Sequence, residues 1–377
     1  MESTLDSPVP RERNPMLDEA NRLKLAVFCV NVARGTSISF AESLPKATWD
    51  ESARLAQAAD RAGLDGFIPL GRWKNNSRGR PEDDRFLEPF TWAAGLAALT
   101  ERISLFATVH MTLFHPIIAA GMASTIDHIS GGRFSINVVA GFNEPEFQMF
   151  GIEQLEHDER YEYADEWLTL AKRIWTSEEA FDFKGLYFDC LEVISKPLPL
   201  QRPYPVIMSA GASPAGRRFA ARQADMIFVH LPGFEELPVV VDAARREARE
   251  TAGRKVGVFA GGYIVCADTE AEAWRRYEYV VRDRLDVAMT SEFVKLWAKE
   301  TRSDDVVPIQ DRVDRMAAGF NALPLVGTPD QIVERMQEMA DGGLAGIAIS
   351  FDDYDEGIAA YDEAIRPLLV EAGLRTI

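Results

Sequence analysis

The sequence predicts an α/β fold, a closed TIM (β/α)8 barrel that carries insertions. Three observations lead to this prediction. Short runs rich in β-branched and apolar residues alternate with longer amphipathic runs, which is the pattern of parallel β/α units. Eight such units can be counted, whereas an open doubly wound sheet usually has about five to seven strands. The chain has 377 residues, of which 47% are hydrophobic, so it is long enough to bury the core of such a barrel.

The first half of the chain contains four of these units. Apolar residues recur at helical spacing after each strand, as Leu55, Ala59 and Ala62 do in the first helix. The strands themselves are short and end before polar or glycine-containing segments. We expect strands over residues 24–30, 66–70, 103–110 and 134–140, and helices over 49–62, 88–101, 116–130 and a longer stretch that includes 161–175.

Two insertions interrupt the second half. Residues 181–194 contain two aromatic-rich runs around Lys184 and Gly185, which predicts a β-hairpin. Residues 280–325 fit no barrel unit and are interpreted as an excursion between the last two strands. We expect the remaining strands over residues 205–209, 226–229, 256–266 and 345–351, and a last helix over 356–369.

The chain therefore divides into a polar tail, residues 1–22, and a single barrel domain, residues 23–377. The tail contains proline and both signs of charge, and it precedes the first strand. We expect residues 1–20 to be dispensable for that reason.

Composition excludes several classes of function. Lys and Arg total 41 against 59 Asp and Glu, and a net charge of −18 repels nucleic acid and anionic lipid. Cys29, Cys190 and Cys266 are too scattered for a disulfide framework, and the histidines lack metal-ligand spacing. No apolar run reaches the ~18 residues of a membrane span, and the N-terminus lacks a signal-peptide core. We expect a cytoplasmic protein without a metal site.

A glycine-rich turn after the fifth strand, residues 209–216, reads Ser-Ala-Gly-Ala-Ser-Pro-Ala-Gly. Ser213 is a candidate N-cap, and Pro214 suits the first helical position. Free N–H groups at a helix start, together with the Ser213 hydroxyl, form a cradle for a phosphate. The turn is not a Walker loop, because Arg217 follows it where a lysine would stand. An ordinary capped helix is the alternative explanation.

Four further residues lie near the C-terminal ends of strands, where such barrels carry their chemistry. Asn137 lies in an otherwise apolar fourth strand, and a buried amide without a partner costs about 1–3 kcal/mol. Thr108 lies near the end of the third strand, and Glu146 follows the fourth. Arg160 lies near the start of the long helix, where the dipole disfavours a cation without a nearby anion. Each also has a structural explanation. Asn137 would be a hydrogen-bonded amide of the interior, and Thr108 a residue that favours strands. Glu146 would be a solvated carboxylate, and Arg160 a surface cation.

Taken together and in this order, these residues resemble the bacterial luciferase-like flavin monooxygenases. The similarity covers about residues 24–372 and is densest over 123–151, with further matching segments at 87–100, 160–163 and 209–216. Within the family the chain is most similar to the branch that contains pyrimidine monooxygenase and dimethylsulfone monooxygenase. The resemblance implies a β/α barrel that binds reduced FMN, supplied by a separate flavin reductase, and uses it to activate dioxygen.

The resemblance also implies roles for individual residues. Thr108 and Asn137 match the threonine and asparagine that flank the dioxygen pocket, and both are expected to be catalytic. Ile68, His110 and Phe142 are expected to line the substrate pocket. Contacts with FMN are expected at Gly71, Arg72, Asn137, Glu146, Arg160, Tyr161 and Ser213.

Departures from the family pattern bear on the substrate. Phe142 stands where the family usually has tryptophan, and residues 71–80 and 110–116 differ from the pattern of the pyrimidine enzymes. The expected substrate is therefore a small uncharged molecule, either an N-heterocycle of pyrimidine or pyridine type or an organosulfur compound.

Two other functions remain open on the same barrel. One is a deazaflavin-dependent dehydrogenase or reductase, which moves hydride without dioxygen. The other is a flavin-binding protein without catalysis. Barrels of this family commonly pair, so the resemblance also implies a homo-oligomer.

Overall fold

Eight parallel strands close into a barrel in the computed structural model, which describes residues 7–74, 85–301 and 309–376. Each strand pairs with its neighbours around the barrel, and the pairings of β10 with β11 and of β13 with β2 complete the circle. The predicted TIM barrel is thus confirmed, and the observed strand bounds lie within two residues of the expected ones. The barrel strands are β2 Lys24–Phe28, β3 Gly66–Ile68, β4 Ser104–His110, β5 Phe134–Val139, β9 Val206–Ser209, β10 Met226–Phe228, β11 Gly257–Cys266 and β13 Gly346–Phe351.

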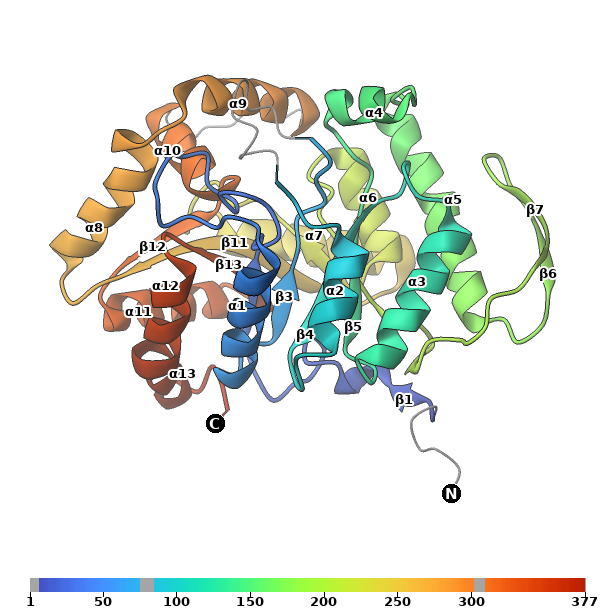
Figure 1. Cartoon of the computed structure of the whole chain (residues 1–377), viewed down its shortest axis with the longest axis horizontal. Coiled ribbons are helices and arrows are strands. Elements are labelled where there is room, and N and C mark those ends of the chain that lie inside the picture. The colour runs from blue at the N-terminus through green and yellow to red at the C-terminus, as the bar shows by residue number, and fades with distance from the viewer. Residues whose placement is uncertain (1–6, 75–84, 302–308, 377) are drawn as a thin grey trace.

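Helices surround the barrel and cover the outer face of its sheet (Figure 1). Two begin at threonines that accept a hydrogen bond from the first helical turn, Thr48 and Thr269. All seven residues of β4 are buried, because the barrel interior and the helix layer cover both faces of the strand. The helices around the barrel are α1 Trp49–Arg61, α2 Pro89–Ala97, α3 Pro116–Ile129, α5 His157–Thr176, α6 Pro214–Gln223, α7 Leu237–Ala252, α8 Glu270–Glu278, α11 Pro329–Asp341, α12 Tyr354–Ala360 and α13 Arg366–Glu371.

Two segments extend the barrel. A hairpin of β6 (Phe181–Lys184) and β7 (Asp189–Val193) projects away from it (Figure 1). Between β11 and β13 the chain forms helices α9 (Val287–Thr301) and α10 (Ile309–Gly319), followed by strand β12 (Leu323–Gly327), which pairs with the second half of β11. Helix α9 lies over one end of the barrel, at the top in Figure 1. A short helix, α4 Glu144–Phe150, lies at the same end.

The described part of the N-terminal tail packs against the opposite end, where the strands begin. Strand β1 (Val9–Pro10) pairs with β8 (Gln201–Arg202), and the side chains of Asn14 and Met16 are buried. The expectation that residues 1–20 are dispensable does not fit these contacts. Removing them would uncover apolar and polar groups that the tail now covers, which has a cost in stability.

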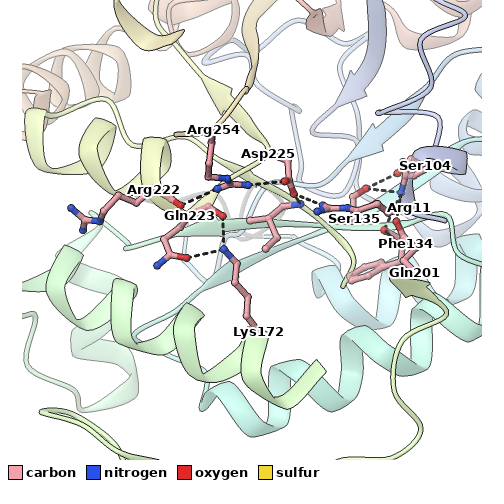
Figure 2. A network of polar contacts seen from close by, with 12 residues as sticks. Arg11, Ser104, Phe134, Ser135, Lys172, Gln201, Arg222, Gln223, Asp225 and Arg254 are labelled. Carbon is pink, nitrogen blue, oxygen red and sulfur yellow. Dashed lines mark hydrogen bonds and ion pairs between the residues drawn. The ribbon is translucent and has the colours of Figure 1, made fainter. Parts of the chain in front are cut away.

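A carboxylate joins this segment to the barrel (Figure 2). Asp225, just before β10, accepts hydrogen bonds from the guanidinium groups of Arg11 and of Arg254, the second at 2.9 Å. It also accepts one from the backbone N–H of Ile207 at 2.9 Å. Both carboxylate oxygens therefore have partners, as buried charges require.

Candidate active site

A cavity of about 200 Å³ lies at the end of the barrel where the strands terminate. Its lining is mostly apolar, and its polar side chains come from strand ends and the loops and helices that follow them. The structure brings every residue singled out from the sequence to this one cavity. They are Ile68, Gly71, Arg72, Thr108, His110, Asn137, Phe142, Glu146, Arg160, Tyr161 and Ser213.

Thr108 on β4 and Asn137 on β5 lie opposite each other in neighbouring strands. The hydroxyl of Thr108 donates to the carbonyl of Pro69 at 2.6 Å. Nδ2 of Asn137 donates to the hydroxyl oxygen of Thr108 at 3.1 Å. Oδ1 of Asn137 is buried and has no hydrogen-bond partner among the described residues. An acceptor left over in an apolar wall costs free energy, so it marks a place where a ligand with a donor would be stabilised.

His110 ends β4 and lines the same cavity, with 5% of the residue exposed. Its ring lies close to two glycines: a Cβ on Gly71 would come within 3.1 Å of Cε1, and one on Gly141 within 3.4 Å of Cδ2. Gly141 also has a φ of +82°, which glycine adopts without strain. Burial lowers the pKa of His110, so its imidazole is neutral at pH ~7. Its buried Nδ1 has no partner within the described ranges.

A buried ion pair lies in the cavity wall. Nε of Arg72 is 3.9 Å from Oε1 of Glu146. The same oxygen accepts hydrogen bonds from the backbone N–H groups of Trp73 at 2.8 Å and Lys74 at 3.2 Å, so Glu146 holds the loop after β3 in place. Burial lowers the pKa of Arg72 and the nearby carboxylate opposes that shift, but a guanidinium stays charged in proteins. The two opposite charges therefore balance each other.

The turn after β9 forms a polar corner of the cavity. Ser213 is the N-cap of α6, and its hydroxyl accepts a hydrogen bond from the N–H of Gly216 at 3.1 Å. A Cβ on Gly211 would lie 2.6 Å from Cα of Gly216, so the turn can close this tightly only with glycines. The hydroxyl of Tyr161 lies next to the same turn. Arg160 is buried and donates to a backbone carbonyl in the loop after β5. This lining supplies hydroxyls, a helix N-terminus and a cation.

The segment between β11 and β13 supplies cavity walls that the sequence analysis did not identify. Trp297 on α9 and Phe320 after α10 line the cavity, and they pack in one apolar cluster with Phe142 and Phe293. The indole of Trp297 lies 4.2 Å from the ring of His230, centroid to centroid. Burial lowers the pKa of His230 to about 3, so this imidazole is also neutral. The aromatic residues of this segment could have indicated a binding site in the sequence, but their position at the cavity follows only from the fold.

Metal-ligating side chains, apolar helices and cysteines provide no other functional site in the described part of the chain. Within residues 7–74, 85–301 and 309–376, no cluster of three or more His, Cys, Asp or Glu side chains is arranged to hold a metal ion. The helices of these same ranges include none with the length and apolar character of a membrane span. The three cysteines are free thiols.

Comparisons with known proteins agree with this fold. The sequence profile of the luciferase-like monooxygenase family matches residues 23–346. A curated relative, the pyrimidine monooxygenase RutA of Acinetobacter baylyi, is 30% identical over 358 residues, which cover 92% of this chain and 95% of the relative.

Solved structures share the fold at lower identity. DmoA from Hyphomicrobium sulfonivorans has a TM-score of 0.81 at 21% identity, covering 94% of this chain and 89% of DmoA. The riboflavin lyase RcaE, solved with modified FMN and riboflavin, has a TM-score of 0.80 at 24% identity, covering 94% and 92%. Because the family profile spans most of the sequence, this chain belongs to the luciferase-like monooxygenase family.

Proposed function

We propose that this chain is the oxygenating component of a two-component monooxygenase, which uses dioxygen and reduced FMN supplied by a separate flavin reductase. The observation that carries the proposal is an apolar cavity whose wall holds two buried polar atoms, Oδ1 of Asn137 and Nδ1 of His110, that have no partner among the described residues. Such atoms are expected where a ligand completes the hydrogen bonding. Membership of a monooxygenase family supports the reaction class.

The residues present fit a flavin mononucleotide. A phosphate needs donors and positive charge, which the first turn of α6, the Ser213 and Tyr161 hydroxyls and Arg160 offer. Because Gly211 has no side chain, the backbone of this turn packs closely against Gly216 at the polar corner of the cavity. The structure of RcaE with modified FMN supports a flavin as the cofactor type. The proposed FMN contacts are Gly71, Arg72, Asn137, Glu146, Arg160, Tyr161 and Ser213.

Reduced FMN would supply the electrons with which dioxygen is activated, so that one oxygen atom enters the substrate. The chain's own residues would control where this happens. Thr108 and Asn137 would form the polar part of the wall near the reacting oxygen, with the Thr108 hydroxyl bonded to the Asn137 amide. Phe142, Trp297 and Phe320 would exclude water from the cavity, which keeps the reaction coupled to the substrate.

Ile68, His110 and Phe142 are proposed to contact the substrate. The imidazole of His110 is neutral, and the charge of Arg72 is balanced by Glu146, so this part of the wall favours an uncharged molecule. We propose a small N-heterocycle of pyrimidine or pyridine type, or an organosulfur compound.

The test combines the purified chain with FMN and a flavin reductase and measures oxygen consumption over a panel of such compounds. With isotope-labelled dioxygen, mass spectrometry should find one labelled oxygen atom in the product. A deazaflavin-dependent dehydrogenase would reduce or oxidise its substrate without consuming oxygen. A non-catalytic protein would bind FMN and form no product. Either of these results would overturn the proposal.

Cytoplasmic location and assembly with a second copy stay predictions. The first follows from the few, scattered cysteines, and the second from the resemblance to a family whose barrels commonly pair. Light scattering after size-exclusion chromatography would measure the mass of the assembly.

A further inference from the structure

The hydroxyl of Thr108 has one hydrogen, and the structure shows where it goes. The Pro69 carbonyl, 2.6 Å away, can only accept, so Thr108 donates its hydrogen there. The hydroxyl oxygen then acts as an acceptor toward Asn137, whose Nδ2 lies 3.1 Å away. In this arrangement Thr108 has no hydrogen left to donate to a molecule in the cavity.

The position of the Thr108 hydrogen also determines the orientation of the Asn137 amide. An amide oxygen facing Thr108 would bring two acceptors together, because the only hydrogen of the hydroxyl is bonded to Pro69. The NH2 group must therefore face Thr108, and Oδ1 must point elsewhere. Oδ1 is the atom that is buried without a partner in the described part of the chain.

The geometry points to Thr108 as a positioning residue that acts through Asn137. Its hydroxyl, held by the Pro69 carbonyl, orients the amide so that Asn137 offers an acceptor to the bound cofactor. The inference rests on the proposed function, since it takes reduced FMN as that cofactor. Reduced flavin carries an N–H group at N5, where oxidised flavin carries a lone pair. An acceptor held in one orientation would stabilise the reduced form and repel the oxidised form.

The experiment measures dissociation constants for oxidised FMN in air and for reduced FMN under anaerobic conditions. We expect wild type to favour reduced FMN. Thr108→Val should lower that preference about tenfold, because the amide is then free to turn. A tenfold change corresponds to a shift of about 30 mV in the two-electron potential of bound FMN. Thr108→Ser keeps the hydroxyl and should retain the preference of wild type.

A double-mutant cycle separates action through Asn137 from direct contact. In an Asn137→Leu background, Thr108→Val should change the preference by less than about twofold, since no amide remains to be oriented. An equal effect of Thr108→Val in both backgrounds would show that Thr108 meets the ligand itself, which would overturn the inference.

A matched control lies four residues further along the chain. Thr112 donates its hydroxyl to the Ala140 carbonyl at 3.2 Å, and no side chain in the described part of the chain donates to it. Thr112→Val therefore removes a comparable hydrogen bond and should leave the preference for reduced FMN unchanged. Circular dichroism would verify that each variant is folded. If wild type binds neither form of FMN, the proposed function fails; if it binds both equally, only the inference fails.

Discussion

Two buried asparagines at opposite ends of the barrel show how differently the ends treat polar groups. Asn14, fully buried under the strand starts, donates from Nδ2 to the Phe134 carbonyl and the Ser135 hydroxyl at 3.1 Å each. Its Oδ1 accepts from the N–H of Met16, also at 3.1 Å. Asn137, 7% exposed at the other end, has a partner among the described residues for Nδ2 but not for Oδ1. Asn14 contacts the start of strand β5, and Asn137 belongs to the same strand.

This difference in hydrogen bonding indicates that one end of the barrel contributes mainly to stability and the other mainly to ligand binding. At the end where the strands begin, here called the closed end, the amide of Asn14 and the carboxylate oxygens of Asp225 (Figure 2) all have partners. Nε of Arg11 is the exception, with no hydrogen-bond partner among the described residues. The paired groups contribute to the stability of the folded state. The cavity end keeps Asn137 and His110 with unpaired buried atoms among the described residues, which destabilises the protein until a ligand binds. Substitutions at the closed end should therefore lower stability and leave ligand affinity unchanged, and substitutions at the cavity end should lower ligand affinity with little change in stability.

The largest effect is expected at the closed end. Asp225→Ala should lower the free energy of unfolding by about 3 kcal/mol, because it leaves Arg11 and Arg254 without their shared carboxylate. Urea denaturation measures this loss, and FMN affinity of the folded variant should not change. Asp341→Ala is the matched control, because its pair with Arg22 at 2.6 Å is exposed. It should cost less than about 0.5 kcal/mol, and a similar loss in both variants would contradict the account.

The next effect is expected in the cavity. Ser213→Ala should weaken FMN binding by about 2 kcal/mol, the scale of a hydrogen bond to a charged group, and should hardly change binding of riboflavin, which lacks the phosphate. Isothermal titration calorimetry measures both affinities. Thr48→Ala removes a similar helix cap, one that accepts from the N–H of Glu51 at 3.2 Å, at α1. It should cost about 1 kcal/mol of stability without changing FMN affinity. If Ser213→Ala keeps the preference for FMN, the phosphate lies elsewhere.

The smallest effect concerns the pH dependence of stability. The pKa of His230 is lowered to about 3 by burial, whereas an unfolded histidine has a pKa of ~6.5. Below pH ~6.5 His230 binds a proton in the unfolded chain but stays neutral in the folded chain. The free energy of unfolding is therefore highest above this pH and decreases as the pH falls. Between pH ~6.5 and ~5 we expect this residue to account for a loss of about 1.6 kcal/mol. His230→Phe, which keeps an aromatic ring beside Trp297, should remove that part of the slope in urea titrations at several pH values; an unaltered slope would rule the contribution out.

Local signals explain what the sequence could predict. Strand periodicity and helix caps depend on neighbours in the chain, so the strand bounds were predicted to within two residues. Thr108, Asn137, Glu146, Arg160 and Ser213 were predicted from their places near strand ends and helix starts, and the other cavity residues from the resemblance to the family. The packing of Asn14 was missed, because its partner Phe134 lies 120 positions away. Trp297 and His230 were missed for the same reason, since their contact joins two different segments of the chain.

In this barrel the closed end stabilises the fold, and the cavity end holds polar groups that a ligand would complete. The most direct test measures the free energy of unfolding and the affinity for reduced FMN in Asn14→Leu and Asn137→Leu. Asn14→Leu should lose about 3 kcal/mol of stability, because several buried groups lose their partner, and should keep its FMN affinity. Asn137→Leu should bind reduced FMN about tenfold more weakly and keep its stability within about 1 kcal/mol, since the substitution also removes an unpaired acceptor. Equal losses of stability, or unchanged FMN affinity in Asn137→Leu, would contradict the account.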